Sequence, residues 1–583
     1  MIKINSIFTR NFQGIDNDSI MHIIRAGVKI KIKTGEYLFR QNDPADVLFI
    51  LISGRLRALK EENENEITVL GDIGEGEPVG EFAFFTDDPR MASVIAIRDS
   101  MVLKFDNNHY LDLVKQKPEL ASFLIKFIIK RLQRNTFELS KTSPPKNIAL
   151  INLKSAQNLE AYTTLIEEEF GNMKVPTRVH NLNAFALEDQ KNVYKKLEQF
   201  DGLNIMICDS DHEDWSKRCL IYADLVIIAT DFYASPELQD IEKEFNLYSQ
   251  NILNKKTYLL LLHPENGTMP NNTSKWLKNR QVNMHIHLRK NHARDTRRFC
   301  RILTHKATGL VLGGGGAKGF AHIGVVKALQ EKGIEVDFLG GTSSGALYGL
   351  GMCYADFQFD KIYTLNEEGV RRKLTSNDIT LPLISMMTGK KFKKYLKEIL
   401  FDHDMEDLWI NSFAVSTNFS KAQMVVHNSG LLWRNLLASM AIPGIFPPVV
   451  INKNLHVDGG VMDNLPIEPM YYYPVDKIIA VSLSTLEIRE VNYEEAPSSW
   501  TLAWDKLSRG KKFKIPGISS IIINSLVLNS QQRQEATKSK VSHFIQLNLK
   551  GIGMLDDKKW KQIQEKGYQQ TMEFLESIEE IQN

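Results

Sequence analysis

Hydrophobic and polar positions alternate differently in successive stretches of the chain. Up to about residue 140, short apolar runs are separated by glycines and turn residues, a pattern typical of a small antiparallel β-roll bracketed by helices. Between residues 146 and about 305, apolar runs of strand type are separated by helical stretches, which predicts a parallel-sheet α/β domain. The runs are 47–51, 67–70 and 101–105 in the first stretch and 147–151, 204–208, 224–229 and 256–262 in the second.

A third stretch combines strand-like runs with glycine-rich turns and helices. The buried strand predicted over 308–312 leads into a glycine loop and a helix, and the strand over 336–339 is followed closely by a helix that opens near Ala346. A chain of 583 residues favours several domains over one core. We therefore predict a multidomain α/β protein, with an N-terminal β-roll and helices at 1–142, a middle parallel-sheet α/β domain at 146–305 and a C-terminal α/β domain at 306–583.

A serine stands on the turn between the strand and helix of the third stretch. Ser343 lies in Gly341-Thr342-Ser343-Ser344-Gly345, where a nucleophile elbow belongs. Such a turn is tight and strained, so its flanks must be small, and Gly341 and Gly345 meet that need. The helix N-terminus also favours a developing alkoxide. Ser343 is therefore the candidate nucleophile.

The upstream glycine loop, Gly313 to Gly319, supplies candidate oxyanion donors. A GxGxxG pattern falls on Gly314, Gly316 and Gly319, which also suggests a dinucleotide site. No acidic residue ends a second strand about 20 residues on, as that site requires, and the serine elbow stands there instead. We expect the N–H groups of Gly314, Gly315 and Gly316 to face a tetrahedral oxyanion. The remaining alternative is a glycine turn selected only for close helix packing.

The candidate base is Asp458, which follows a strand-like run and precedes Gly459 and Gly460. These glycines let another backbone approach closely. Asp458 can take the Ser343 proton or polarise the hydroxyl, provided that partial burial raises its basicity. Without the serine elbow, Asp-Gly-Gly is more often a simple turn. A triad is the other alternative, because His543 follows the acid in chain order, whereas His322 beside the glycine loop reads as structural.

The glycine loop, GxSxG and DGG, in this order, resemble the patatin-like phospholipase family and its neuropathy target esterase branch. The resemblance covers residues 306 to 580 and includes Glu406-Asp407-Leu408-Trp409, Ser416-Thr417-Asn418, the run 438–448 and Asp463-Asn464-Leu465-Pro466. It implies a patatin-like hydrolase domain with a Ser343/Asp458 dyad. Lys318 departs from the family, which usually has arginine there, and a lysine lacks the planar fork for bidentate binding.

The β-roll carries a second resemblance. Gly80-Glu81-Phe82-Ala83 and the run from Pro89 to Val94 resemble the phosphate-binding cassette of cyclic nucleotide-binding domains. By that resemblance Glu81 accepts from the ribose 2′-hydroxyl, Arg90 pairs with the cyclic phosphate, and the amides near Ala83 and Ala92 complete an anion nest. Met91, bulky where the family has a small residue, leaves open which nucleotide binds, if any. A structural Glu81–Arg90 ion pair is the alternative.

Composition narrows the function classes. A net charge of +2 gives no bulk electrostatic case for nucleic acid binding. The four cysteines occur singly, which fits a reducing compartment, and His285 and His287 on one strand face lack further ligands, so no metal is expected. The chain start lacks a signal-peptide pattern and no run reaches about 20 apolar residues, so we expect a cytoplasmic protein without a membrane span.

Two helical segments bear on membrane contact. Residues 390–400 form a basic amphipathic pattern of the kind that lies on anionic lipid, but a solvated helix face is the favoured interpretation. Residues 518–528 are apolar around much of the helix and favour a buried core helix. The long helix over 120–139 ends at the linker signal Ser143-Pro144-Pro145, and the middle domain, without a Walker-type loop, is interpreted as a linker or transmitter.

Taken together, these patterns predict a serine esterase for acyl esters of phospholipids or lysophospholipids, regulated by a cyclic nucleotide at the β-roll and without a catalytic cofactor. Peripheral membrane contact is expected, and head group, acyl length and oligomeric state stay open. Two alternatives remain. One is a lipid transacylase, and the other is a cyclic-nucleotide-responsive binding protein with an idle hydrolase domain.

Overall fold

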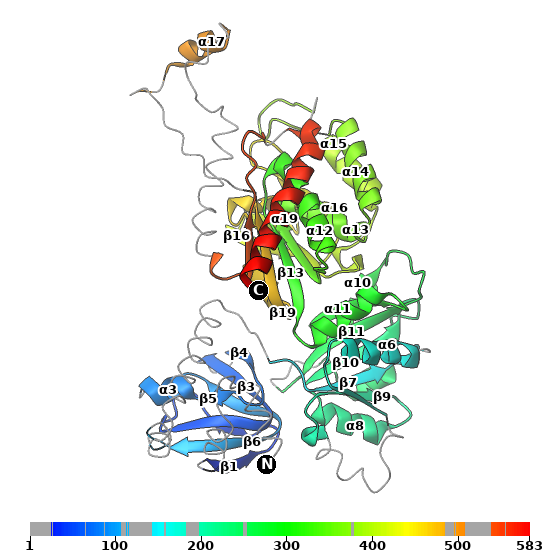
Figure 1. Ribbon diagram of the computed structural model, residues 1–583, viewed down its shortest axis with the longest axis vertical. Helices are drawn as coiled ribbons and strands as arrows, with labels where there is room; N and C mark the ends of the chain where they lie inside the picture. The colour runs from blue at the N-terminus through cyan, green and yellow to red at the C-terminus, as the bar shows by residue number, and fades with distance from the viewer. Residues whose placement is uncertain are drawn as a thin grey trace. The chain divides into compact units, whose positions relative to one another are not determined.

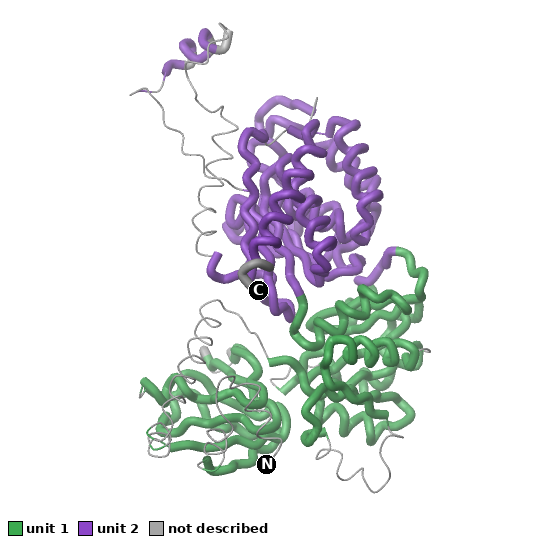
Figure 2. The backbone as a smooth tube through the Cα atoms, viewed as in Figure 1, with its two compact units in different colours: residues 1–268, 275–307 green, residues 269–274, 308–583 purple. Residues whose placement is uncertain are grey.

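A computed structural model describes most of the chain. The described residues are 25, 27–63, 66–86, 88–106, 112, 115, 143–156, 159–181, 197–248, 253–374, 378–483, 495, 497–507, 538–553 and 556–582. They fall into two compact units, one made of residues 1–268 and 275–307 and the other of 269–274 and 308–583 (Figure 2).

The first sheet of unit 1 is an antiparallel roll. Its six strands run in the order β1-β6-β3-β4, with β2 paired to β6 and β5 to β3. Leu51, Leu56 and Val102 fill one face of the roll, while Leu59, Ile95 and Ile97 pack together separately. The elements are β1 (Val28–Ile32), β2 (Tyr37–Phe39), β3 (Val47–Asn63), β4 (Glu66–Ile73), β5 (Pro78–Val79), α3 (Glu81–Thr86) and β6 (Ser93–Asp106).

The second sheet of unit 1 is parallel, in the order β12-β11-β10-β7-β9-β8. Its central strands are buried along their length, as expected when helices cover both faces of a parallel sheet. Figure 1 shows α6, α8 and α11 around these strands. The elements are β7 (Asn147–Asn152), α6 (Leu159–Asn172), β8 (Thr177–His180), β9 (Leu203–Cys208), α8 (Glu213–Tyr222), β10 (Leu225–Asp231), α9 (Asp240–Glu244), β11 (Lys256–His263), α10 (Thr273–Leu277), β12 (Met284–Arg289) and α11 (Ala293–Leu303).

Unit 2 is built on an eight-stranded mixed sheet in the order β17-β18-β15-β14-β13-β19-β20, with β16 paired to β15. The strand elements are β13 (Ala307–Leu312), β14 (Phe338–Thr342), β15 (Ser412–Asn418), β16 (Gln423–His427), β17 (Val449–Ile451), β18 (Asn454–Asp458), β19 (Val475–Ser482) and β20 (His543–Gln546). The α-helices are α12 (Ala321–Glu331), α13 (Ser344–Tyr354), α14 (Phe359–Arg371), α15 (Lys390–Leu400), α16 (Leu432–Ser439), α17 (Ser499–Leu507) and α19 (Trp560–Gln582). Short 3-10 helices are η3 (Gly316–Phe320), η4 (Met405–Asp407), η5 (Gly459–Val461), η6 (Glu468–Tyr472) and η7 (Asp557–Lys559).

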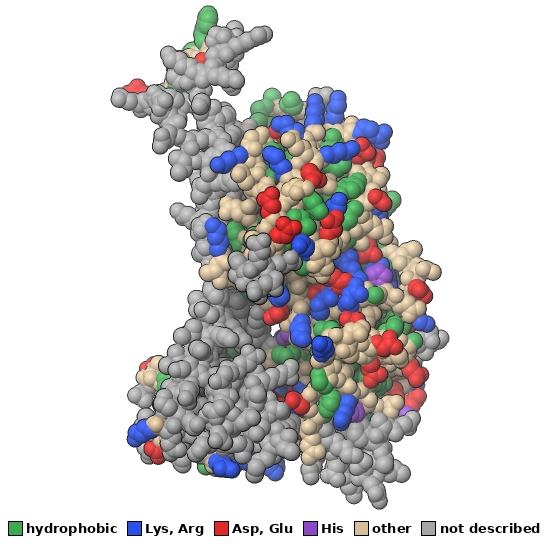
Figure 3. Space-filling view, viewed as in Figure 1, with side chains coloured by type: hydrophobic (Ala, Val, Ile, Leu, Met, Phe, Trp, Pro, Cys, Tyr) green, Lys and Arg blue, Asp and Glu red, His purple; other side chains and the backbone are tan. Residues whose placement is uncertain are grey.

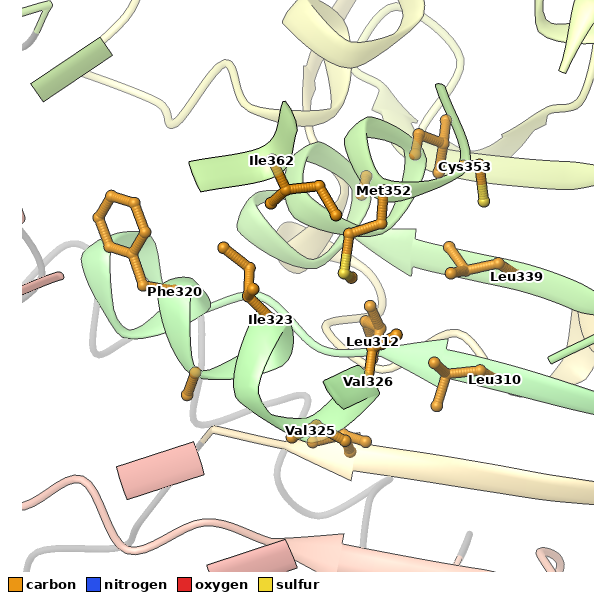
Figure 4. Packing of buried hydrophobic residues seen from close by; sticks show 14 of the residues in the cluster. Leu310, Leu312, Phe320, Ile323, Val325, Val326, Leu339, Met352, Cys353 and Ile362 are labelled. Atoms are coloured by element: carbon orange, nitrogen blue, oxygen red, sulfur yellow. The ribbon is translucent and has the colours of Figure 1, made fainter. Parts of the chain in front are cut away.

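The main core of unit 2 lies between the sheet and its helices. Leu310 and Leu312 of β13 face Ile323 and Val326 of α12, and Met352 of α13 closes the group (Figure 4). All five side chains are essentially inaccessible to solvent. Because protein interiors are close-packed, this core fixes where β13 and β14 end and where α13 begins, and the candidate nucleophile lies between β14 and α13.

The predicted fold class is confirmed: the chain is multidomain α/β, with a β-roll, a parallel middle sheet and a third α/β sheet. The boundaries 1–142, 146–305 and 306–583 stay a prediction. The strand predicted over 336–339 begins at Phe338 and continues to Thr342. The helices predicted over 120–139 and 518–528 lie outside the described residues. None of the helices in the described ranges is long and apolar enough to cross a bilayer.

Candidate active site

Ser343 lies between the end of β14 and the start of α13, as its motif predicts. Its backbone has a φ of 55° and a ψ of −124°, which is strained for a residue with a side chain. The turn leaves no room beside it, since a Cβ on Gly345 would lie 2.1 Å from the Leu312 carbonyl oxygen. On Gly341 it would lie 2.7 Å from the Gly345 carbonyl carbon. The two flanking glycines therefore permit the elbow.

A second serine, Ser439 at the end of α16, holds the elbow from behind. The Ser343 N–H donates to Ser439 Oγ at 2.9 Å, and Ser439 Oγ donates to the Val415 carbonyl at 2.7 Å. Ser439 is fully buried, so each of these bonds is shielded from water. Ser439 belongs to the run 438–448 that resembles the patatin-like family, but the sequence predicts no role for it. Its contact with Ser343 joins residues 96 positions apart and leaves no local pattern.

Asp458 ends β18, which pairs with β15 so that Asp458 lies opposite Ser416. Its Oδ1 accepts the Gly460 N–H at 2.7 Å. Its Oδ2 is buried and has no partner with full hydrogen-bond geometry, although the Ser343 hydroxyl lies close enough to lower the pKa of Asp458. Burial is the larger effect and raises that pKa to about 6. The acid and the serine therefore lie side by side, with one carboxylate oxygen available to the hydroxyl.

The glycines after Asp458 allow this close packing. A Cβ on Gly459 would lie 2.3 Å from the Val415 carbonyl oxygen and 2.9 Å from Thr342 Cγ2. A Cβ on Gly460 would lie 3.1 Å from Asp458 Oδ1. Asp-Gly-Gly thus brings the carboxylate against β14 and β15, which a simple surface turn would not do.

The glycine loop is fixed by hydrogen bonds within the protein. The Gly314 N–H donates to the Asn464 carbonyl at 3.1 Å, and the Gly315 N–H donates to Ser344 Oγ at 2.9 Å. These two amides, predicted as oxyanion donors, therefore already have acceptors in this structure. Gly316, at a φ of 61°, lines the cavity beside Ser343. Gly319 serves packing, since its Cβ would lie 2.6 Å from that of Ser344.

Asn464 is a further residue whose role sequence reasoning missed. Its Nδ2 donates to the Gly314 carbonyl at 3.1 Å, so side chain and backbone of one residue clamp the loop from both directions. Its Oδ1 would lie 2.5 Å from a Cβ on Gly314 and 3.0 Å from one on Gly460. Asn464 therefore touches the glycine loop and the Asp-Gly-Gly turn together.

The histidines near the site do not form a triad with Ser343. His543 lies on β20, three positions from β14 in the sheet, or about 14 Å at strand spacing. His322 is buried, and its Nε2 bonds the Gly313 carbonyl at 2.8 Å, with a pKa that burial lowers to about 4. His427 Nε2 and His456 Nδ1 both bond Ser416 Oγ, at 2.6 and 2.8 Å. The triad alternative is wrong for His543.

A cavity of about 1000 Å³ opens at Ser343. Its walls are mostly apolar and come from α13, α14, α15 and the segment after α16. Tyr395 Oη reaches the Leu365 carbonyl, and burial raises the pKa of Tyr395 to about 12 and that of Tyr348 further, so both phenols stay neutral. This volume is at the upper end of the range for small-molecule sites, which suits a long hydrocarbon chain.

The nucleotide cassette of the roll is present but engaged with its own backbone. Arg90 is buried, its Nη1 donates to the Gly80 carbonyl at 2.7 Å, and its Nη2 donates to the Val47 carbonyl. Its guanidinium lies 4.4 Å from the Phe39 ring centre. Glu81 at the start of α3 is also buried, whereas Met91 is 69 % exposed. Two of the guanidinium nitrogens of Arg90 are thus bonded to backbone carbonyls in this structure.

The sheet, the elbow and the glycine loop of unit 2 define a patatin-like phospholipase domain. Residues 310–471 match the family model described as patatin-like phospholipase. Residues 29–117 match the cyclic nucleotide-binding domain, and 178–310 match the neuropathy target esterase family P-loop like domain. The loop after β7, residues 153–156, nevertheless contains no glycine.

The chain is similar over most of its length to several curated proteins. Lysophospholipase nte1 of Aspergillus fumigatus is 27 % identical over 96 % of this chain and 42 % of its own length. Patatin-like phospholipase domain-containing protein 6 of Homo sapiens is 28 % identical over 92 % of this chain and 44 % of its own. This chain therefore spans less than half of each relative.

Among solved structures, a cyclic nucleotide-binding domain from Methylobacillus flagellatus is 19 % identical and covers 24 % of this chain and 78 % of its own. Its TM-score is 0.22, which adds nothing to the family match of the roll.

Proposed function

We propose that this protein is a serine esterase that hydrolyses acyl esters of phospholipids or lysophospholipids through Ser343 and Asp458. The observation that carries the proposal is the strained serine on the wall of an apolar cavity, beside a buried carboxylate with a raised pKa. The patatin-like match of residues 310–471 and the names of the similar proteins support the same substrate class.

In the proposed reaction the acyl chain lies in the cavity and its ester carbonyl meets Ser343 Oγ. Asp458 Oδ2 takes the hydroxyl proton as the oxygen attacks, and this works without histidine because burial has raised the basicity of the carboxylate. The Gly316 N–H is the first donor to the oxyanion, and the Gly315 N–H joins when it exchanges Ser344 Oγ for the new charge. The protonated Asp458 then releases its proton to the leaving alcohol.

In deacylation, water takes the place of the Ser343 hydroxyl as the nucleophile, and Asp458 is again the base. Asp458 accepts a proton from water, the hydroxide attacks the acyl-serine carbonyl, and the fatty acid leaves as Ser343 regains its proton. If a lipid hydroxyl replaces water at this step, the product is a new ester. Product analysis with added acceptor lipid separates hydrolysis from transacylation.

The test is hydrolysis of a lysophospholipid and a soluble short-chain ester by Ser343→Ala and Asp458→Asn. We expect both variants to lose at least about 10³-fold in kcat, since a nucleophile and its base act as a unit. Ser429→Ala and Asp402→Asn, which change exposed residues of the same unit, are the matched controls. Full activity in Ser343→Ala would overturn the proposal.

A second function is supported by the match of residues 29–117, namely that the roll binds a cyclic nucleotide and regulates the esterase. Glu81 would accept from the ribose hydroxyl and Arg90 would bind the cyclic phosphate once it leaves the Gly80 carbonyl. Calorimetry with cyclic AMP and cyclic GMP, on wild type and Arg90→Gln, tests binding. Regulation requires different affinities in two conformational states, so unchanged kinetics despite binding would remove it.

A further inference from the structure

A short loop of unit 2 presents apolar side chains to solvent. Ile379, Leu381, Leu383 and Ile384 are 82, 72, 84 and 72 % exposed, within six consecutive residues. A single exposed leucine is ordinary, but four large apolar side chains in one loop form a contiguous patch of the kind that marks an interaction site. We call residues 379–384 the apolar loop.

The base of the apolar loop is held by hydrogen bonds. The Thr380 N–H donates to the Met386 carbonyl at 3.0 Å, and the Thr388 N–H donates to the Asp378 carbonyl at 2.8 Å. Met386 and Met387 in turn donate to Gly444 and Ile445 at 2.9 Å each. Backbone hydrogen bonds therefore anchor the base of the loop, and its apolar side chains project from this anchored base into solvent.

The same loop borders the cavity of the candidate active site. Ile379, Thr380 and Pro382 belong to the cavity wall, together with Met386 and Met387 at the loop base. The apolar surface outside is thus continuous with the apolar wall that leads to Ser343. Four of these five wall residues are apolar, so this side of the cavity offers a hydrocarbon chain a mainly apolar path.

Basic side chains begin where the apolar loop ends. The Lys390 N–H donates to Thr388 Oγ1 at 3.2 Å, so α15 starts at the loop base. Its five lysines are exposed at positions 390, 391, 393, 394 and 397, and its one acidic residue, Glu398, pairs with Arg372. Figure 3 shows lysine and arginine side chains, with hydrophobic ones among them, at the end of the unit where Figure 1 places α14 and α15.

Because the apolar face of α15 is buried, the apolar loop and not this helix can contribute apolar side chains to a membrane. Phe392, Leu396 and Leu400, the apolar face of this helix, are packed in the core of unit 2. The helix therefore cannot place that face in lipid. The membrane-lying alternative for residues 390–400 is wrong in this respect, while the exposed lysines agree with the favoured solvated face. The lysines of α15 are exposed, although Lys394 lies 3.8 Å from Glu398 and Lys393 and Lys397 lie over the Trp433 ring. They give this surface positive charge, while the apolar loop provides the exposed apolar side chains.

We propose that the apolar loop inserts into the surface of a bilayer containing anionic lipid, with the α15 lysines against the phosphates. Apolar side chains beside a cluster of lysines match the two layers of such a surface, hydrocarbon below and negative charge above. The insertion would also bring the cavity to its lipid substrate, a consequence that rests on the proposed function.

The experiment is vesicle flotation with the full chain, using phosphatidylcholine vesicles with and without about a third phosphatidylserine. We expect binding to the anionic vesicles, weakened by salt and at least about tenfold weaker in the double variant Leu381→Ser/Leu383→Ser. Neither residue belongs to the cavity wall, so hydrolysis of a soluble short-chain ester should be unchanged. The matched control is Phe419→Ser/Val450→Ser, at positions 68 and 52 % exposed elsewhere in the unit.

Equal binding of wild type and the loop variant, or no binding by wild type, would overturn the proposal. A dimer in sedimentation velocity that the loop substitutions dissociate would assign the loop to a second copy of the chain instead, and would also overturn it. If wild type does not hydrolyse the soluble ester, the esterase function is refuted. The flotation result would still decide whether the apolar loop binds a membrane.

Discussion

The cavity predicts which residue limits acyl chain length. Gly351 lies on the cavity wall in α13, eight residues after Ser343, and a Cβ there would meet no atom within 4 Å. A side chain at this position would therefore extend into the open cavity. At the helical rise of about 1.5 Å per residue, the position is about 12 Å along the helix from the serine.

That distance sets the expected chain length. An extended hydrocarbon advances by somewhat less than one C–C bond length of about 1.5 Å per carbon, so roughly nine carbons reach Gly351. In Gly351→Leu an eight-carbon acyl chain should fit, whereas a sixteen-carbon chain would lose burial of roughly seven carbons. At about 0.8 kcal/mol per methylene the upper limit of that loss is about 6 kcal/mol. An acyl chain that bends into another part of the cavity would keep part of this burial energy.

We expect kcat/KM for the sixteen-carbon ester to fall at least about tenfold, or about 1.4 kcal/mol, with the eight-carbon ester changed little. The assay compares both esters on wild type, Gly351→Leu and the control Gly351→Ala. Leucine and alanine both favour a helix over glycine, so neither variant should melt earlier. An equal fall in kcat/KM for both esters, or no fall for the longer ester, would refute the proposed position of the acyl chain along α13.

Other predictions concern the proposed dyad and its support. Because burial raises the pKa of Asp458 to about 6, kcat/KM should rise with pH through about 6 and then level off; a profile flat from pH 4 to 8 would contradict the assigned base. The raised pKa also means that folding favours the protonated acid, so this contribution to stability is full below about pH 4 and is lost as pH rises through about 6. Asp458→Asn should therefore have a larger free energy of unfolding than wild type at pH 8, by at most about 3 kcal/mol, and should melt at a higher temperature; a lower melting temperature would count against a buried charge. Ser439→Ala removes the acceptor of the Ser343 N–H, so we expect about a tenfold fall in kcat with KM nearly unchanged, and Ser439→Thr, which keeps the hydroxyl, should retain more; wild-type kcat in Ser439→Ala would exclude its positioning role.

Local chemistry explains which parts could be predicted from the sequence. The elbow at Ser343 follows from small residues around one serine between a strand and a helix, and these requirements lie within five positions. The parallel middle sheet follows from long apolar runs at regular spacing. In both cases the pattern and the cause are close together in the chain.

The missed features depend on contacts between distant segments. Ser439 reaches Ser343 from α16, and Asn464 reaches Gly314 across 150 positions, so neither leaves a local pattern. Hydrogen bonds to Asn464 and Ser344 also occupy two amides of the glycine loop, which the motif alone could not reveal. The sequence of residues 390–400 predicts an amphipathic helix, which α15 is, but the pattern cannot say whether its apolar face meets lipid or protein.

The most direct test of the central claim is covalent labelling by a serine-reactive fluorophosphonate, followed by intact mass and peptide mapping. We predict one adduct, on Ser343, that is absent from Ser343→Ala and strongly slowed in Asp458→Asn, because the probe reacts only with a serine activated by its base. No adduct on folded wild-type protein, or an adduct on another serine, would contradict the account and favour a binding protein with an idle hydrolase domain.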